Sequence, residues 1–298
     1  MRLLIFGFGY TGAALAERLI PQGWDVDGVA RSERSRAAMQ ACGVRPINPE
    51  SLDAAAGEAR AILVAAPPDE TGCPGLHALS PALARTRNFP DWIGYLSSTG
   101  VYGDRGGGWV LEESRLAARS PEGARRVRAE CDWMQVGRGM GLTVTAFRLP
   151  GIYGPALSCG LGGRSPFDRL RAGTARRIVK LGQVFSRIHV HDLAAGLEAS
   201  LRRPRPGGVY NLCDDLPAPP QDVTAYAAAL LGLPPPPEVG FDSNTQSPMQ
   251  QRFYAESKRV SNAHAKAELG WQLAYPTYRE GLEAVLASES EVTSGTAR

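Results

Sequence analysis

The stretch Leu3-Leu4-Ile5-Phe6-Gly7-Phe8-Gly9-Tyr10-Thr11-Gly12 decides the fold, because in it a short apolar run passes directly into three closely spaced glycines. The apolar run predicts a buried strand, and the alanine- and leucine-rich residues from Ala13 to Leu19 predict the helix that follows. In such a unit the first glycine allows a tight turn, the second lets a ligand approach the backbone, and the third lets helix and strand pack closely.

Further apolar runs follow at intervals typical of alternating strands and helices. Because they are continuously apolar, we expect each strand to be buried on both faces, as in a parallel sheet covered by helices. The sequence therefore predicts an α/β fold, a Rossmann-type doubly wound parallel sheet. The runs are residues 26–30, 61–65, 92–96 and 142–147.

After Pro150, glycine, proline and arginine become more frequent and the apolar segments become shorter. We expect residues 1–152 to form a nucleotide-binding domain, with about 183–212 folding back into it, since residues 208–212 read as one more strand. Residues 153–288 are expected to form a smaller substrate-binding domain closed by two amphipathic helices, and residues 289–298 a flexible tail.

Composition excludes several classes of protein. Of 298 residues, 43% are hydrophobic and 21% are charged, and the net charge is only +3, with the basic residues scattered along the chain. These values predict a globular protein with neither a nucleic-acid nor a membrane partner. No apolar run approaches the ~20 residues that span a bilayer, and the N-terminus lacks the cleavage site of a signal peptide, so we expect a cytoplasmic protein.

Five cysteines are spread through the chain, and none stands in a C-x-x-C pair. Their odd number and wide spacing fit neither a structural zinc site nor a disulfide framework, so we expect reduced thiols and no metal centre. The cysteines are Cys42, Cys73, Cys131, Cys159 and Cys213.

The glycine loop also predicts a ligand, because the free N–H groups and positive dipole at such a helix start suit the pyrophosphate of a nicotinamide dinucleotide. At the tip of the second strand, Arg31 stands where NAD-binding proteins carry a carboxylate. This favours the 2′-phosphate of NADP, with NAD as the alternative and a solvated loop arginine as the other interpretation of Arg31. The remaining expected contacts are Gly7, Phe8, Gly9, Tyr10, Thr11, Gly12, Ala65, Ala66 and Pro67.

Four further stretches and a short strand motif occur in an order that resembles the extended short-chain dehydrogenase/reductases, the NAD-dependent epimerase/dehydratase family. The resemblance runs to about residue 285 and implies a Rossmann domain with a C-terminal substrate domain. The stretches are residues 96–104, 120–126, 148–155 and 187–194, followed by Val209-Tyr210-Asn211.

The resemblance implies site residues at the ends of two strands. Ser98, with Thr99 beside it, holds the position of the family's hydroxyl that orients the substrate oxygen, although a strand-end serine also caps loose N–H groups. Pro150 and Gly151 resemble the loop that lines the nicotinamide carboxamide. The family also implies a homodimer.

The family's catalytic tyrosine and lysine are missing, which makes the chain similar to atypical members. Aligned on Ser120-Pro121-Glu122-Gly123, the tyrosine position is Glu122 and the lysine position is Arg126. We expect these two to pair on one helix face, which favours an ionised carboxylate and a poor proton donor. Glu122 could serve as a base and Arg126 could hold ribose hydroxyls; alternatively this is a surface helix start with Ser120 as N-cap.

Other candidate site residues also have purely structural interpretations. Tyr102 and Tyr153 precede glycines near the expected nicotinamide and could carry a proton, although such pairs often only pack loops. His189 and His191 share a strand face with Asp192 close by, but we expect Asp192 to cap a helix rather than a metal to bind.

Nucleotide-sugar enzymes of the family often carry an arginine two residues before the Ile188-His189 step, where this chain has Ser186. Strand alternation predicts that the neighbouring side chain of Arg187 points the other way. A nucleotide-sugar substrate is therefore less favoured, although it is not excluded. The sequence therefore predicts an NAD(P)-dependent oxidoreductase or epimerase-like enzyme acting by hydride transfer on a small polar molecule, with sugars as candidates. The alternative is a non-catalytic NADP(H)-binding regulator resembling NmrA-like sensors.

Overall fold

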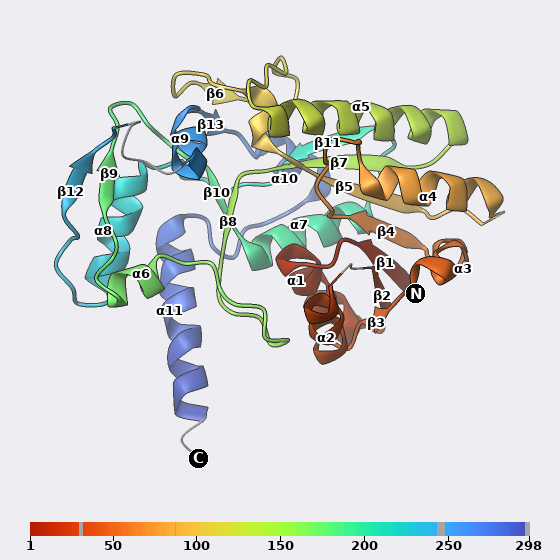
Figure 1. Cartoon of the computed structure of the whole chain (residues 1–298), viewed down its shortest axis with the longest axis horizontal. Coiled ribbons are helices and arrows are strands. Elements are labelled where there is room, and N and C mark those ends of the chain that lie inside the picture. Colours follow the sequence, from red (N-terminus) through yellow and green to blue (C-terminus); the bar gives the residue numbers. More distant parts are fainter. Residues whose placement is uncertain (30–31, 87, 243–247, 296–298) are drawn as a thin grey trace.

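The computed structural model describes residues 1–29, 32–86, 88–242 and 248–295, so Arg31 lies outside the described residues. Its centre is a seven-stranded sheet in the order β11-β7-β5-β4-β1-β2-β3, in which every neighbouring pair is parallel (Figure 1). The strands are β1 (Arg2–Phe6), β2 (Asp25–Val29), β3 (Arg45–Pro46), β4 (Ala61–Val64), β5 (Trp92–Ser98), β7 (Val144–Leu149) and β11 (Gly208–Asn211).

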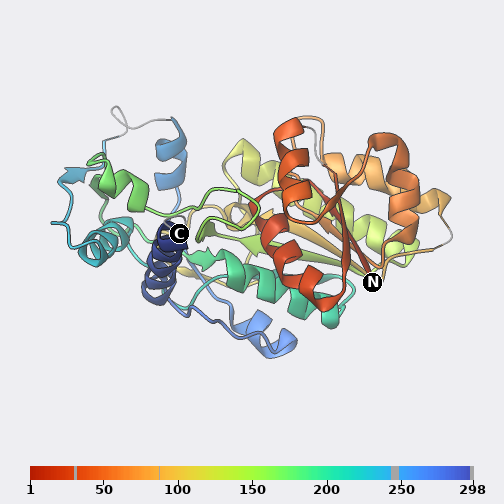
Figure 2. The ribbon, with the colours of Figure 1, turned by 90° about the horizontal axis from the view of Figure 1, so that it is seen from below.

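Helices cover both faces of the sheet, because alternate residues of each strand pack into two different cores. Leu3 and Ile5 of β1 join the core under α1 (Tyr10–Leu19), α2 (Glu33–Ala41) and α7 (Val190–Arg202). Leu4 joins the opposite core, under α3 (Leu52–Glu58), α4 (Pro74–Arg85) and α5 (Pro121–Met140). Figure 2 shows α1 and α7 side by side on the face turned to the viewer. The predicted doubly wound parallel sheet is confirmed.

A smaller unit lies beside the carboxyl edge of the sheet, at the left of Figure 1. Its core joins Phe167, Val223 and Ala227 to Leu282 and Val285 of the last helix. That helix continues to Gly295, so residues 289–295 are helical where we expected the flexible tail to begin. The unit contains α6 (Phe167–Arg171), β9 (Arg177–Val179), α8 (Pro220–Leu230), β12 (Glu238–Gly240), α9 (Pro248–Tyr254) and α11 (Tyr278–Gly295).

Part of the range expected for the small domain packs on the large one instead. Strand β13 (Arg259–Val260) pairs with β6 (Trp109–Val110), and α10 (Ala263–Leu269) packs against α7 and β11. The indole N–H of Trp271 donates to the carbonyl oxygen of Asp192 at 3.1 Å, and this bond holds the segment after α10 against α7. The domain range 153–288 is therefore interrupted. The remaining short elements are η1 (Ile20–Gln22), η2 (Pro49–Ser51), η3 (Thr99–Tyr102), β8 (Gly151–Tyr153) and β10 (Arg187–His189).

A hairpin loop, residues 154–164, lies across α1 and closes with an antiparallel bridge between Gly154 and Arg164. The hydroxyl of Tyr10 donates to the carbonyl oxygen of Pro155 at 2.6 Å, and the amide of Ser158 donates to the Glu17 carboxylate at 2.7 Å. These bonds hold the hairpin loop on the large domain.

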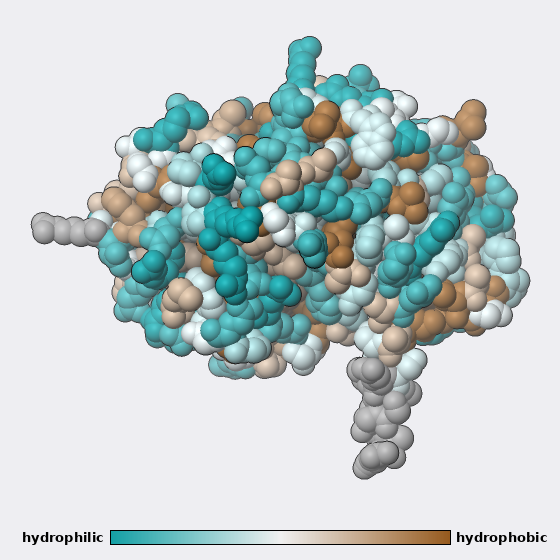
Figure 3. Space-filling model, turned by 180° about the vertical axis from the view of Figure 1, so that it is seen from behind, coloured by the Kyte–Doolittle hydropathy of each residue, from teal (hydrophilic) through white to brown (hydrophobic). Residues whose placement is uncertain are grey.

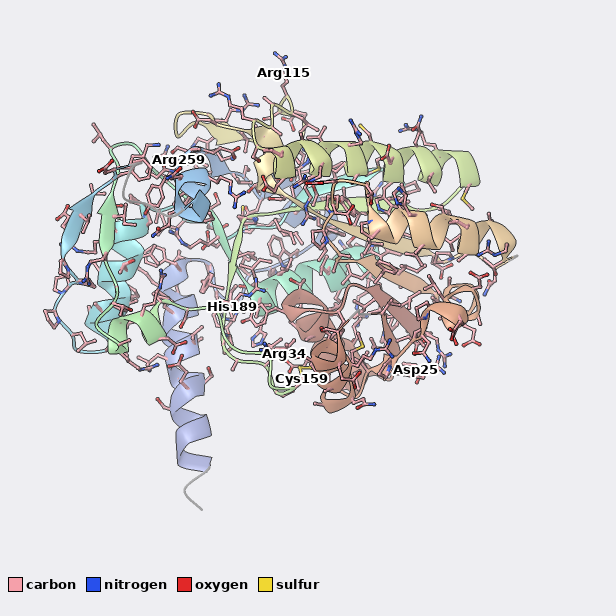
Figure 4. The ribbon with its side chains drawn as sticks, viewed as in Figure 1. Asp25, Arg34, Arg115, Cys159, His189 and Arg259 are labelled. Atoms are coloured by element: carbon pink, nitrogen blue, oxygen red, sulfur yellow. A yellow bond between two sulfur atoms is a disulfide. The ribbon has the colours of Figure 1, made fainter. Side chains whose placement is uncertain are left out.

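The expectation that all five cysteines are reduced thiols is wrong for two of them. Cys42, at the end of α2, forms a disulfide with Cys159 in the hairpin loop, and their Cα atoms are 4.7 Å apart (Figure 4). Cys73, Cys131 and Cys213 are free. The pair is separated by 117 residues, so spacing along the chain carried no sign of it.

The surface is mixed in character. Figure 3 shows hydrophobic residues scattered among hydrophilic ones on the back of the molecule. Within the described residues, no helix combines the length and the apolar character needed to cross a membrane.

A buried ion pair ties the sheet to α5. Arg148 of β7 donates from Nη2 to Glu130 Oε2 at 2.8 Å, and both side chains are only 6% exposed. Nη1 of Arg148 donates to the hydroxyl of Tyr102 at 3.0 Å, and Tyr102 donates in turn to Oδ1 of Asn211 at 2.7 Å. The network therefore joins β7, α5, η3 and β11.

We expect Glu130→Gln to lower the free energy of unfolding by about 3 kcal/mol, because it leaves the Arg148 guanidinium buried without its counter-charge. Urea unfolding measures the loss. Asp53→Asn is the control, since its partner Arg85 lies on the surface, where solvent screening leaves an ion pair with little effect on stability. Equal losses in the two variants would contradict the assignment of a buried pair.

Candidate functional site

Three cavities lie along the carboxyl edge of the sheet. The first, which we call the loop cavity, has a volume of about 830 Å³ and lies over the glycine loop. It is lined by Phe6, Gly7, Phe8, Gly9, Val29, Ser32, Ser35, Ala65, Ala66, Pro67, Asp69, Thr71, Pro74, His77 and Ala78. Predicted cofactor residues Tyr10, Thr11 and Gly12 form the first turn of α1 beside it.

The three glycines of the loop differ in what a side chain would meet at each position. Gly7 has φ of +93°, and a Cβ there would lie 2.4 Å from the amide nitrogen of Ala66. Gly12 packs so closely that its Cβ would lie 3.0 Å from Ile5. Gly9 has an ordinary extended backbone with φ of −151°, and among the described residues a Cβ there would meet no atom within 4 Å. Space is therefore left at Gly9 itself.

This free space lies at the N-terminus of α1, where Gly9 is the N-cap. Among the described residues, no side chain caps this end of the helix by a hydrogen bond. The first N–H groups of a helix have no intrahelical acceptor, and the dipole gives that end a partial positive charge. The loop cavity can therefore hold an anionic group against backbone amides.

Sequence reasoning missed several polar residues of the loop cavity. Ser32 is the N-cap of α2, accepts from the amide of Ser35 at 3.2 Å, and lines the cavity together with Ser35. The serine directly before a helical pattern was the available signal. Thr71 lies opposite and donates its amide to Oδ1 of Asp69 at 2.9 Å.

The second cavity, the edge cavity, has a volume of about 250 Å³ and lies at the ends of β5 and β7. Ser98 and Thr99 line one side with Pro150 and Gly151, so the structure brings these four predicted residues together. Ser98 Oγ also accepts from the amide of Gly100 at 3.1 Å and thus caps η3. Further lining residues are Gly100, Leu149, Val184, Phe185, Ser186, Arg252, Phe253, Glu256, Lys258 and Val260.

Glu122 and Arg126 lie elsewhere, and the expectation that they pair with each other is wrong. Glu122 is half exposed and accepts from Nη1 of Arg252 at 2.9 Å, whereas Arg126 donates to the carbonyl oxygen of Leu96. Ser120 caps α5 by accepting from the amide of Gly123 at 3.1 Å. The alternative of a capped surface helix start therefore describes this segment.

Tyr102 and Tyr153 are both buried, which disfavours loss of their protons. Tyr102 lies in the Arg148 network, and burial raises its pKa to about 12. Tyr153 donates weakly to the carbonyl oxygen of Thr277 at 3.4 Å, and burial raises its pKa as well. Tyr102 does not line the edge cavity, and its hydroxyl is bonded to Arg148 and Asn211 in the buried network, so a role in proton transfer stays a prediction.

Glu256 and Lys258 are functional candidates that sequence reasoning missed. They form an ion pair on the wall of the edge cavity that faces the strand ends. Lys258 is only 9% exposed. One signal was available, because lysine occurs at only three positions, Lys180, Lys258 and Lys266, among 33 basic residues.

The third cavity, the domain cavity, has a volume of about 390 Å³ and shares Gly151, Phe185, Ser186 and Phe253 with the edge cavity. It extends toward the small unit, where Tyr153, Val223, Tyr278 and Leu282 line it. Three cationic side chains also line it, namely Arg164, Arg169 and Arg187.

The expectation that Arg187 points away from this region is wrong. Arg187 lines the domain cavity, and its guanidinium donates to the carbonyl oxygens of Phe185 at 2.9 Å and Ala218 at 3.2 Å. Strand β10 begins at Arg187, so Ser186 lies outside the strand. The alternation of side chains along a strand therefore does not relate these two residues. Burial lowers the pKa of Arg187, while burial raises the pKa of nearby Asp214 to about 8.

His189, and not the expected Asp192, is the N-cap of α7. It lies between the sheet and the small unit (Figure 4), where Nδ1 accepts from the amide of His191 at 3.3 Å and caps α7. Asp192, the expected cap, instead accepts from the amides of Ala274 at 2.7 Å and Tyr275 at 2.9 Å. The described part of the chain contains no group of three metal-ligating side chains.

Comparison with known proteins gives relatives in sequence and similar folds. No family model matches the sequence. The chain is 29% identical over 293 residues to protein YeeZ of Escherichia coli (strain K12), covering 92% of this chain and 96% of that protein. It is 47% identical to a functionally unknown conserved protein from Silicibacter pomeroyi, with a TM-score of 0.85 and coverage of 96% and 98%.

Two more distant structures show the same fold. The human epimerase family protein SDR39U1, solved with NADPH, has a TM-score of 0.76 at 20% identity, covering 96% of this chain and 99% of that chain. The dTDP-glucose 4,6-dehydratase of Bacillus anthracis, solved with NAD, has a TM-score of 0.76 at 17% identity, covering 98% and 97%.

We expect acid to destabilise the fold through His189. Burial lowers its pKa to about 3, so between the ordinary value of 6.5 and that value only the unfolded chain takes up the proton. Stability is therefore lost as pH falls through this window, by about 2 kcal/mol between pH 7 and pH 5.

His189→Asn, which keeps a capping acceptor but does not titrate, should lose about 2 kcal/mol less over the same interval. Urea unfolding of both proteins at pH 7 and pH 5 gives the difference and cancels the contributions of other groups. The same acid sensitivity in both proteins would show that His189 does not cause it.

Proposed function

This chain belongs to the family of the Silicibacter pomeroyi protein and has the fold of the extended short-chain dehydrogenase/reductases, and on that premise we propose that it is an NAD(P)-dependent oxidoreductase or epimerase-like enzyme. One observation carries the proposal. The loop cavity and the edge cavity lie along the same carboxyl edge, and the hydroxyls of Ser98 and Thr99 line the edge cavity. In doubly wound sheets dinucleotides and substrates bind along this edge.

The residues present fit a nicotinamide dinucleotide. The open space at Gly9 and the uncapped start of α1 suit its pyrophosphate, and Ala65, Ala66 and Pro67 line the adjoining wall. Pro150 and Gly151 line the edge cavity, where the nicotinamide half would lie. When bound, this group would supply or accept a hydride. The chain itself must bind the substrate, orient its oxygen and move a proton.

NADP is the cofactor that we propose. Both oxygens of Asp27, in the second strand, accept from Arg45 at 2.8 Å, so this buried carboxylate is engaged away from a ribose. Ser32 and Ser35 offer hydroxyls in the loop cavity. Arg31 follows the strand in the sequence and would pair with a 2′-phosphate.

A small polar substrate that carries an anionic group fits the domain cavity. Arg164, Arg169 and Arg187 line it, and a planar guanidinium matches the geometry of a phosphate or carboxylate. Tyr153, Val223 and Leu282 supply apolar contacts for the rest of the molecule. Because this cavity adjoins the edge cavity, one molecule can be held here and react beside Ser98.

A non-catalytic NADP(H)-binding regulator is the second candidate. It is favoured by the positions of Glu122 and Arg126, which stand in the family's catalytic positions and are used for structural contacts.

The experiment that separates the two mixes purified protein with NADPH and a panel of aldehydes, ketones and keto-sugars, with and without phosphate or carboxylate groups. We expect NADPH oxidation with anionic members of the panel. Binding of NADPH without turnover of any member would reject the enzyme and favour the regulator.

We expect Gly9→Val to weaken NADPH binding at least about 100-fold, because the added side chain fills the space proposed for the pyrophosphate. Calorimetry measures the affinity. The fold should persist, since φ of −151° suits any residue. Gly7→Ala is the contrasting control and should destabilise the protein through its contact with Ala66. Unchanged affinity in Gly9→Val would remove the loop cavity from cofactor binding.

Arg31→Ala should weaken NADPH by roughly 10- to 100-fold and NADH very little, because a charge-assisted hydrogen bond to the 2′-phosphate contributes about 1.5–3 kcal/mol. Fluorescence titration with both cofactors measures the ratio. Arg36→Ala is the matched control, since Arg36 is engaged by Oδ1 of Asn48 at 2.9 Å. Equal losses for the two cofactors would refute the preference for NADP.

A further inference from the structure

We propose that Lys258, held by Glu256, is the proton donor to the reacting oxygen of the substrate. The inference rests on the proposed function, which requires a proton to accompany hydride transfer. It assigns to a distant part of the chain the role that the missing tyrosine and lysine of α5 have in the family.

Lys258 lines the small edge cavity together with Ser98 and Thr99. Its ammonium donates to Oε2 of Glu256, which lines the same cavity. Removing two such charges from water is costly unless they are paired, so an ion pair inside a cavity points to a functional site more than one on the surface does.

The backbone around Lys258 is held from both sides. The amide of Ser257 donates to Oδ1 of Asp104 at 2.8 Å, and Ser257 Oγ donates to the carbonyl oxygen of Gly182 at 3.0 Å. The amide of Val260 donates to Oγ of Ser186 at 3.0 Å. A side chain mounted on such a fixed segment keeps its position relative to Ser98, as a proton donor must.

The choice of residue also matters. Among the described residues most ion pairs use arginine, as in Arg60–Asp91 and Arg85–Asp53, and lysine occupies only three positions of the sequence. A guanidinium keeps its proton at any ordinary pH, whereas an ammonium can release one. A lysine in the edge cavity therefore supplies chemistry that an arginine there would not.

Other candidates near the edge cavity are engaged elsewhere. Arg252 at its margin pairs with Glu122 at 2.9 Å, and Tyr102 belongs to the buried network. Ser98 Oγ accepts from the amide of Gly100, which leaves its own proton to donate a hydrogen bond to the substrate oxygen. Ser98 thus orients this oxygen while Lys258 protonates it.

In the reducing direction, a bound reduced nicotinamide would supply the hydride to the carbonyl carbon, and the electron pair of the C=O π bond would move to the oxygen. That oxygen takes a proton from Lys258 Nζ, which gives the alcohol and leaves a neutral amine beside Glu256. Water from the open side of the cavity restores the proton. In the oxidising direction the neutral amine accepts the proton instead.

Variants test the proton transfer in the NADPH panel. Lys258→Arg keeps the positive charge but not the labile proton, so kcat should fall about 100-fold or more while the Kd for NADPH changes less than about twofold. Lys266→Arg is the matched control, because Lys266 pairs with Asp215 outside the cavity, and should keep full activity. Full kcat in Lys258→Arg would overturn the inference.

A second readout is independent of turnover. Protein labelled with 13C at lysine Cε should give three lysine signals, and Lys258→Arg identifies the one from Lys258. Saturating NADP⁺ should shift this signal and leave those of Lys180 and Lys266 in place. If calorimetry shows binding but the Lys258 signal does not move, the inference is overturned and the cofactor proposal stands. If calorimetry shows no binding, the proposed function fails first.

Discussion

The close approach of β1 and β4 at their carboxyl ends is the constraint on which the candidate site depends. Gly7 leaves the sheet in a conformation that few other residues adopt, and its backbone lies against Ala66 so tightly that no side chain fits between them. This contact turns the chain into α1 at the right place, so the helix start opens toward the loop cavity.

The opposite wall of the site is built from chain that is distant in sequence. Residues 252–260 reach across the strand ends of β5 and β7, and β13 pairs with β6 to hold them. The edge cavity therefore lies between the large domain and residues 252–260. Its polar groups come from both sides, with hydroxyls on the sheet side and charges on the returning side.

Sequence reasoning succeeded where a local pattern has a local cause. Apolar runs predicted the strands of the central sheet apart from β3, and the glycine loop predicted the turn into α1, because both depend on neighbouring residues. It failed where contacts join distant segments. Glu122 pairs with Arg252 rather than with Arg126, and Cys42 meets Cys159, because chain topology brings these residues together. Glu256 and Lys258 belong to no motif that we used, so only the folded chain shows that they share a cavity with Ser98.

The hairpin loop has a mechanical consequence. It is attached to the large domain covalently through Cys159 and non-covalently through Pro155 and Ser158. These attachments restrain the chain directly after Gly154, where it passes from β8 into the hairpin loop. Any displacement of α6 relative to the sheet must therefore leave residues 155–159 in place on α1 and α2.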